Sequence, residues 1–511
     1  QLQQFATRLD IYKDRGGDPV GVRLVNSGIS DTEIQHIFTY EMARKLSRWY
    51  PQQIEINWER ISEEPVEAIA GVLPLLVSWQ ENDLLDNADA FDVCRWLSEA
   101  RSRSQPTTLL VLLNLLKNSG LPDNVQHLLY ESIELPLLWQ LGDTHASRTM
   151  NRVASAGRFY QRTPLRRRSA DLRHELRKPG RALQLLSPRD GEILVRKVSE
   201  VLAVRYRELF PLTNANPEEV CLCEPGRGLQ VYLFGTKPES RLPLEANFGA
   251  MFVRNGLPIG YGVAVVLFDR VEIAVNVFPA FRTGESAYLI EQFFRIFYQH
   301  FGSRVFLVRK GQMGHGDDEP LKSGAFWFYY RLGFRAFDAR VRELAERENQ
   351  KLRAKQSYRC SLATLKQLSK SDVVFCTDGI TAADYRELSL VGLSNAVTIL
   401  ANKQLGGNRR AMERSAAARL RRVLEISDLA SWSATEREAL DRLAPLLVNI
   451  AGLASWSKRD RVGLAQIIRA KGGRQEKKFV ELGNRHRRLH DALAKLAVAH
   501  TGSKLDPVKP A

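Results

Sequence analysis

The sequence predicts an α+β fold, with a central mixed sheet that has helices on both faces and mainly helical regions at the N-terminal and C-terminal ends. Strand-like runs gather in the middle of the chain and are followed by helix, strand and helix, an order typical of α+β domains. On either side of this segment, apolar residues recur at helical spacing. The 511 residues also exceed the roughly 250–300 that one core can fill, so we expect two or three domains.

Composition divides the chain into four segments. Residues 1–147 are expected to form a helical domain, 148–189 a basic linker, 190–345 the α+β domain, and 346–511 a second helical domain. Within the first segment, the spacing of apolar residues predicts helices over 32–50 and 125–139.

The central segment has the clearest pattern of strands. A helix over 191–210 precedes expected strands at 230–234, 249–254, 259–267 and 271–278. Asn255-Gly256 is a strong signal for a two-residue hairpin between the second and third of these strands. A helix over 285–300, a strand over 304–308 and a helix over 323–332 follow.

The C-terminal segment carries one short repeat. Leu429-Ala-Ser-Trp-Ser433 recurs 24 residues later as Leu453-Ala-Ser-Trp-Ser457. Ser433 with Glu436 forms a capping-box pattern, and Ser457 can cap a second helix in the same way. Two helices that pack alike are therefore expected, with a last helix over 475–500.

The overall charge is strongly basic, with a formal net charge of +16. A basic chain attracts anions, which include nucleic acid, acidic membrane surfaces, phosphorylated cofactors and acidic carrier proteins. The five cysteines are scattered, with no spacing typical of a zinc site, and indicate a reducing compartment. The apolar runs are shorter than the roughly 18 residues that a spanning helix needs. We expect a cytoplasmic protein without a membrane span and without a bound metal.

Basic residues are densest between Arg148 and Arg181, where ten arginines and one lysine accompany two carboxylates. Phe159 and Tyr160 lie among them. Arginine with aromatic side chains can bind phosphates and stack on bases, so this run is a candidate for nucleic-acid binding. A solvated linker is the alternative, because charge runs often only solvate a surface.

A strand-to-helix corner is expected between Val277 and Ala287. The first amides of a helix have no intrahelical partner and lie at the positive end of its dipole. Such a corner binds a diphosphate through the backbone. The small residues Gly284, Ser286 and Ala287 let a ligand come close to that backbone.

These residues resemble the diphosphate motif of the GNAT superfamily of N-acetyltransferases. Val277, Pro279, Arg282 and Ala287 match the motif in register, whereas Glu285 stands where the family usually has glycine. A carboxylate there opposes an anion unless its side chain turns away to cap the helix. A second match lies in 323–334, where Ala325 and Tyr329 precede Leu332-Gly333-Phe334. The resemblance is confined to 190–345.

The resemblance implies a substrate and a set of binding residues. Acetyl-CoA or another acyl-CoA would enter between two splayed central strands, and backbone amides near Val277 would hold its thioester carbonyl. Its diphosphate would bind at the helix start, through the residues Arg282, Thr283, Gly284, Glu285, Ser286 and Ala287. An acidic acyl carrier protein is a further possible partner.

Three residues are candidates for catalysis. Tyr329 matches the tyrosine that in the family often protonates the leaving thiolate, although it could be one more aromatic residue in its helix. Glu272 lies on the strand where family members often place a base, although it could simply be solvated. His315 lies in a loop with Asp317, Asp318 and Glu319. It could act as a base, and the carboxylates could hold a cationic amine; a flexible solvated loop is the alternative.

The leading hypothesis is an acyl-CoA-dependent N-acyltransferase that transfers an acyl group to an amine. A malonyl-thioester decarboxylase on the same fold is one alternative. Another is a degenerate, catalytically inactive relative that binds nucleic acid or protein.

Overall fold

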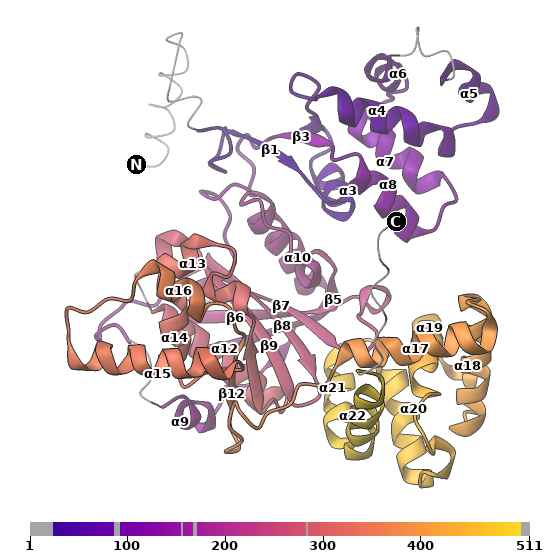
Figure 1. The fold of residues 1–511 in the computed structure, drawn as a ribbon. Helices are drawn as coiled ribbons and strands as arrows, with labels where there is room; N and C mark the ends of the chain where they lie inside the picture. The colour runs from indigo at the N-terminus through magenta and orange to yellow at the C-terminus, as the bar shows by residue number, and fades with distance from the viewer. Residues whose placement is uncertain (1–23, 86–91, 155–156, 167–170, 283–284, 502–511) are drawn as a thin grey trace. The chain divides into compact units, whose positions relative to one another are not determined.

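The computed structural model describes residues 24–85, 92–154, 157–166, 171–282 and 285–501, which form two compact units (Figure 1). The first unit contains the described residues up to 154, with 193–213 and 256–258. The second contains 157–192, 214–255 and the remainder from 259 onward. Both units contain helices and strands, so the mixed α and β composition is confirmed.

The first unit holds a three-stranded antiparallel sheet in the order β1-β3-β2. Its strands are β1 (Glu33–Ile37), β2 (Ile54–Ile56) and β3 (Pro136–Gln140). Trp139 of β3 lies opposite Ile34 on one side and Ile54 on the other, and all three side chains are buried.

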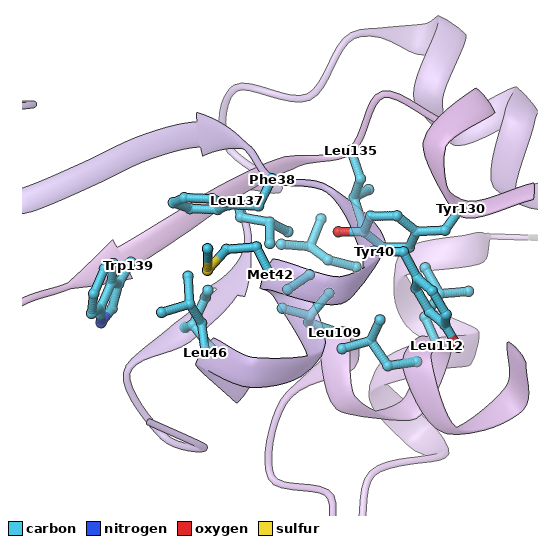
Figure 2. Packing of buried hydrophobic residues seen from close by; sticks show 14 of the residues in the cluster. Phe38, Tyr40, Met42, Leu46, Leu109, Leu112, Tyr130, Leu135, Leu137 and Trp139 are labelled. Carbon is cyan, nitrogen blue, oxygen red and sulfur yellow. The ribbon is translucent and has the colours of Figure 1, made fainter. Parts of the chain in front are cut away.

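The first unit also contains short helices. They are α3 (Tyr40–Trp49), α4 (Glu63–Val72), α5 (Trp79–Leu85), α6 (Val93–Glu99), α7 (Thr108–Asn118) and α8 (Asp123–Ser132). Figure 2 shows Met42 and Leu46 of α3 among the buried residues, with Leu137 and Trp139 of the sheet. The Tyr40 and Tyr130 rings lie 5.3 Å apart and join α3 to α8.

Two expected helices in this unit are wrong in part. Residues 32–50 form β1 followed by α3, because Thr39 is extended and its hydroxyl accepts a hydrogen bond from the Met42 amide at 3.4 Å. Residues 125–139 form the end of α8 and then β3. The strand begins at Pro136, a residue that disfavours a helix interior.

The second unit is built on a nine-stranded mixed sheet in the order β11-β12-β10-β9-β8-β7-β6-β5-β4. Strands β9 and β10 run parallel, and their outer neighbours β8 and β12 pair with them antiparallel. The strands are β4 (Gln184–Leu185), β5 (Ala215–Gly226), β6 (Leu229–Thr236), β7 (Ala246–Arg254), β8 (Leu257–Leu267), β9 (Arg270–Val277), β10 (Val305–Val308), β11 (Arg335–Ala336) and β12 (Val373–Cys376).

Several helices lie between the strands of this sheet in the sequence or beside them. One is α12 (Ser286–His300), which the sequence predicted at 285–300. Aromatic rings hold it on the sheet, for example Phe293 against Phe252 at 5.2 Å and Phe294 against Phe306 at 5.4 Å. The others are α9 (Leu172–Arg177), α13 (Asp318–Lys322), α14 (Ala325–Arg331), α15 (Ala339–Ala354) and α16 (Leu362–Leu368).

Two expected segment boundaries and the bounds of one expected helix differ from the structure. The expected linker 148–189 contains α9, which packs on α12, and β4, which pairs with β5. The sheet continues past residue 345, because β12 inserts between β10 and β11. The helix expected over 191–210 is α10 (Pro188–Ala203); the positive φ of +55° at Tyr206 is incompatible with its continuation.

Beyond β12 the second unit is helical. Its helices are α17 (Leu390–Leu405), α18 (Arg409–Val423), α19 (Ala434–Leu447), α20 (Lys458–Gly472), α21 (Glu476–Arg485) and α22 (Arg487–Thr501). The capping box of Ser433 and Glu436 is confirmed at the start of α19, and Ser457 caps α20. The last helix, expected over 475–500, is divided at His486, whose ring Nδ1 accepts a hydrogen bond from the Leu489 amide at 3.1 Å.

Four buried charged residues join these helices to the sheet. Arg241 and Glu219 come from the sheet region, Lys471 from α20 and Glu476 from α21. The Arg241 guanidinium donates to the Thr236 carbonyl at 3.0 Å and to the Lys471 carbonyl at 2.8 Å. The two carboxylates and two cations balance, which a buried set of charges requires.

Within the described residues, no helix is both long enough and apolar enough to cross a membrane. The five cysteines are free thiols.

Candidate functional site

The predicted corner lies where β9 and β10 separate. β9 pairs with β8 along its whole length, from Arg270 to Val277. It pairs with β10 only over its first three residues, ending where Glu272 lies opposite Leu307. Among the residues that the structure describes, the rest of β9 therefore has no strand partner on that edge. Beyond Val277 the chain forms a short 3₁₀ turn, η3 (Pro279–Phe281), and then enters α12.

Arg282 links the corner to a second predicted part of the site. Its guanidinium donates to the Val277 carbonyl at 2.9 Å, which holds the turn against the end of β9. It also forms an ion pair with Glu319 at 2.6 Å. The structure thus brings the acidic loop and the helix start together. A weaker hydrogen bond of 3.4 Å joins Arg282 to Asn276, whose amide in turn donates to the Tyr261 hydroxyl at 2.9 Å.

Glu285 is the N-cap residue of α12, yet its side chain does not cap the helix. The carboxylate is buried and forms ion pairs with Arg227 and with Arg254, the latter at 3.1 Å. It also accepts a hydrogen bond from the Arg166 amide at 2.7 Å. Burial pushes the pKa of Glu285 upward, but these hydrogen bonds and charges outweigh burial and hold the pKa below its ordinary value.

The position of these arginines keeps Glu285 away from the gap between β9 and β10. Arg254 ends β7, and Arg227 lies in the turn between β5 and β6. In the strand order, both lie on the opposite side of β9 from β10. Two guanidinium groups face one carboxylate, so the cluster has a surplus of one positive charge (2 − 1 = 1) at the start of α12.

The other predicted binding residues continue the helix start. Ser286 and Ala287 occupy its first turn, where backbone amides lack intrahelical acceptors. The Ser286 hydroxyl donates to the Arg282 carbonyl at 3.1 Å. Thr283 and Gly284 lie outside the described residues.

Tyr329, the expected acid, is buried in an aromatic cluster. Its ring packs on Phe334 at 5.5 Å and on Phe328 at 5.3 Å. Burial raises the pKa of Tyr329, so the phenol keeps its proton at neutral pH. As expected, the helix that carries it, α14, ends in a left-handed glycine, Gly333, whose φ is +103°.

The two expected bases have different surroundings. Glu272 forms an ion pair with Arg309 at 2.7 Å, and Arg309 also pairs with Asp372 and Glu387. The Glu272 carboxylate is therefore already paired with a guanidinium in this network. His315 is exposed in the loop between η4 (Lys310–Met313) and α13, the loop that Glu319 joins to the corner.

The basic run from Arg148 to Arg181 is partly used inside the protein. Arg166 and Lys178 form ion pairs with the buried carboxylate of Glu175, and Lys178 does so at 2.7 Å. Arg173 donates to the Cys376 carbonyl at 3.1 Å and lies over the Phe375 ring. These contacts attach α9 to the rest of the second unit, so this run is not a wholly solvated linker.

Sequence reasoning missed the three groups around Glu285. Arg227, Arg254 and Arg166 lie 58, 31 and 119 residues from it, so no local pattern connects them. Among the residues the structure describes, no group of three or more His, Cys, Asp or Glu side chains is arranged to hold a metal ion.

Comparison with protein-family models, with curated proteins and with solved structures gives no match for this chain. The function must therefore be inferred from the chemistry of the site.

Proposed function

We propose that the second unit binds acyl-CoA at the β9–α12 corner and transfers its acyl group to an amine, as an acyl-CoA-dependent N-acyltransferase. The observation that carries the proposal is the parting of β9 from β10 directly beside a helix start. The parting leaves an edge of β9 open, and the helix start offers backbone amides to a diphosphate.

Local charge also favours an anion at this corner. The Glu285 carboxylate is compensated by Arg227 and Arg254, with one positive charge left over. Arg282 is 40% exposed and its partner Glu319 is 64% exposed, so an incoming phosphate can compete for the guanidinium. The net charge of +16 would help to attract an anionic donor or an acidic acyl carrier protein.

Transfer requires that the amine lose a proton, attack the thioester carbonyl and expel a thiolate. The C–N bond forms first and gives a tetrahedral oxyanion, and the collapse of this oxyanion then breaks the C–S bond. Backbone amides at the open edge of β9 could stabilise the oxyanion that forms in between. His315 is exposed in the loop before α13, the helix whose Glu319 pairs with Arg282, and could accept the amine proton. The protonated Tyr329 is the candidate donor to the thiolate.

Arg282→Glu is expected to weaken CoA binding about tenfold or more, because the variant replaces attraction for the diphosphate with repulsion. Isothermal titration with CoA, acetyl-CoA and malonyl-CoA measures the effect. Arg340→Glu is the matched control: it makes the same charge change at an exposed position of α15 and should leave affinity unchanged. The proposal fails if the wild type binds none of the three ligands.

Tyr329→Phe is expected to bind CoA as the wild type does but to transfer the acyl group about a hundredfold more slowly, the low end of the effect of losing a general acid. Phenylalanine keeps the ring that packs on Phe334. Mass spectrometry of products, with acetyl-CoA and a panel of amines, gives the rate. An unchanged rate would give Tyr329 a structural role only, and release of CO₂ from malonyl-CoA without an acceptor would indicate a decarboxylase instead.

A further inference from the structure

Two adjoining grooves on the C-terminal helices carry a large excess of positive charge. The first has a volume of about 760 Å³ and lies along α20, the end of α21 and the start of α22. Its charged lining is Lys458, Arg459, Asp460, Arg485, Arg487 and Arg488. The count is five lysines and arginines against one carboxylate, which makes this groove a candidate for binding an anion.

The second groove, of about 580 Å³, continues from the first. The two share Gln466 and Leu482 in their linings. The second adds Arg469, Arg474 and Lys478, with Glu436 as its one carboxylate. Together the grooves present eight cations and two carboxylates (5 + 3 against 1 + 1).

Half of these cations are uncommitted. Lys458, Arg459, Arg485 and Arg487 are exposed and form no ion pair with any residue that the structure describes. Their charges are therefore available to an external ligand. These four side chains differ from Arg166 and Lys178, which are used in structural ion pairs with Glu175.

Each groove also contains an arginine that is held in place by the repeated Leu-Ala-Ser-Trp-Ser motif. In the first copy, Arg469 lies 5.7 Å from the centre of the Trp432 ring and pairs with Glu436 at 3.1 Å. Glu436 is the third residue after the cap Ser433.

The second copy has the same geometry. Arg488 lies 5.2 Å from the centre of the Trp456 ring and pairs with Asp460 at 3.1 Å. Asp460 is the third residue after the cap Ser457. The repeat thus places one fixed guanidinium in each of two consecutive grooves, an arrangement suited to a ligand with regularly repeated negative charges.

We propose that these two grooves form a binding site for the phosphate backbone of a nucleic acid. A polyphosphate chain supplies successive charges along a continuous groove, whereas an anionic membrane offers a plane that groove walls contact poorly. Trp432 and Trp456 are buried and offer no face for base stacking. The contacts are therefore to phosphates, and binding has no strong sequence preference.

This site is independent of the proposed acyltransferase corner, because none of its residues comes from β9, η3 or the start of α12. Its test uses the full chain with labelled 20-nucleotide single-stranded RNA, single-stranded DNA and duplex DNA. Fluorescence anisotropy gives the affinity at several salt concentrations from 50 mM upward.

Arg485→Ala/Arg487→Ala is expected to lower affinity about tenfold at 50 mM salt. Losing two phosphate contacts should also flatten the plot of log affinity against log salt, by about 1.4 for single strands (2 × 0.7) or about 1.8 for a duplex (2 × 0.9). Both side chains are exposed and unpaired within the described residues, so circular dichroism should show an unchanged fold. The ligand that the wild type binds with the highest affinity identifies the kind of nucleic acid.

Arg340→Ala/Arg347→Ala is the matched control, since it removes the same charge from exposed positions of α15. Affinity and salt dependence should stay as in the wild type. The proposal is overturned if the wild type binds none of the three ligands at 50 mM salt, even where it binds an acidic carrier protein. It is also overturned if the control loses as much affinity as the groove variant, because net charge alone would then explain binding.

Discussion

Arg241→Met is expected to lower the free energy of unfolding by about 3–5 kcal/mol at pH 8, the cost typical of removing one partner from a buried ion pair. The Arg241 side chain is 1% exposed and donates hydrogen bonds to carbonyls of the sheet region and of α20. Among the described residues of this cluster, its loss leaves Lys471 alone to balance Glu219 and Glu476. Urea unfolding followed by circular dichroism measures the change.

The loss should be smaller at pH 5.5. Burial raises the pKa of Glu219 to about 7, and the charge of Arg241 opposes that rise. A carboxyl group whose pKa is raised in the folded state stabilises the fold fully below its unfolded pKa. It loses that contribution as the pH rises through the folded pKa. Without Arg241 the folded pKa rises further, so ionising Glu219 at pH 8 costs more than in the wild type.

Arg442→Met provides the control. Arg442 lies on α19, is 40% exposed and pairs with the similarly exposed Glu438, so its removal should cost less than about 1 kcal/mol. Equal losses of unfolding free energy in the two variants would mean that the buried Arg241 cluster contributes no more to stability than an exposed ion pair. Unchanged stability of Arg241→Met would show that the cluster does not join the C-terminal helices to the sheet.

Local patterns were sufficient to predict the central strands and α12, and insufficient for the short strands of the first unit. The strands from β6 to β9 are runs of eight or more residues, and the Asn255-Gly256 turn marks one of their junctions. By contrast, β1 has five residues and pairs with β3, more than 100 residues away. Its apolar spacing fits a helix equally well, and only the distant partner decides between the two.

The same limit applies to the site. The pattern of residues after Val277 predicted the strand-to-helix corner, and the resemblance of these residues to a diphosphate motif singled out Arg282 and Glu285. The charge environment of Glu285, however, depends on Arg227, in the turn between β5 and β6, and on Arg254, at the end of β7. The repeat in the C-terminal helices predicted its two caps in the same way. It did not predict that arginines 33 and 28 residues after Glu436 and Asp460 return to pair with them.

Both proposed sites therefore combine a local motif with cations from elsewhere in the chain. At the corner the cations surround a carboxylate, which leaves one surplus charge. In the grooves, four cations have no ion-pair partner among the described residues. Neutralising Glu285 at the corner should therefore leave the positive charges of Arg227 and Arg254 free to bind an anion. Neutralising arginines in the grooves can only remove positive charge.

Glu285→Gln is expected to tighten CoA binding about tenfold, because Arg227 and Arg254 are then uncompensated beside the helix start. The same variant should lose about 2–4 kcal/mol of unfolding free energy at pH 7, since a buried carboxylate with three hydrogen-bonding partners is removed. Calorimetric titration with CoA and urea unfolding give the two values. Opposite changes in affinity and stability are the signature of a site whose ligand and side chain compete for the same cations.

The stability difference between wild type and Glu285→Gln should shrink on acidification. The pKa of Glu285 is held below its ordinary value, so its contribution is present above the unfolded pKa near 4.5 and is lost as the pH falls through the folded pKa. Glu346→Gln, at an exposed position of α15, should alter neither stability nor CoA affinity. A Glu285→Gln protein that is destabilised but binds CoA no better would exclude the start of α12 as the diphosphate site, because freed arginines beside a bound diphosphate must strengthen its binding.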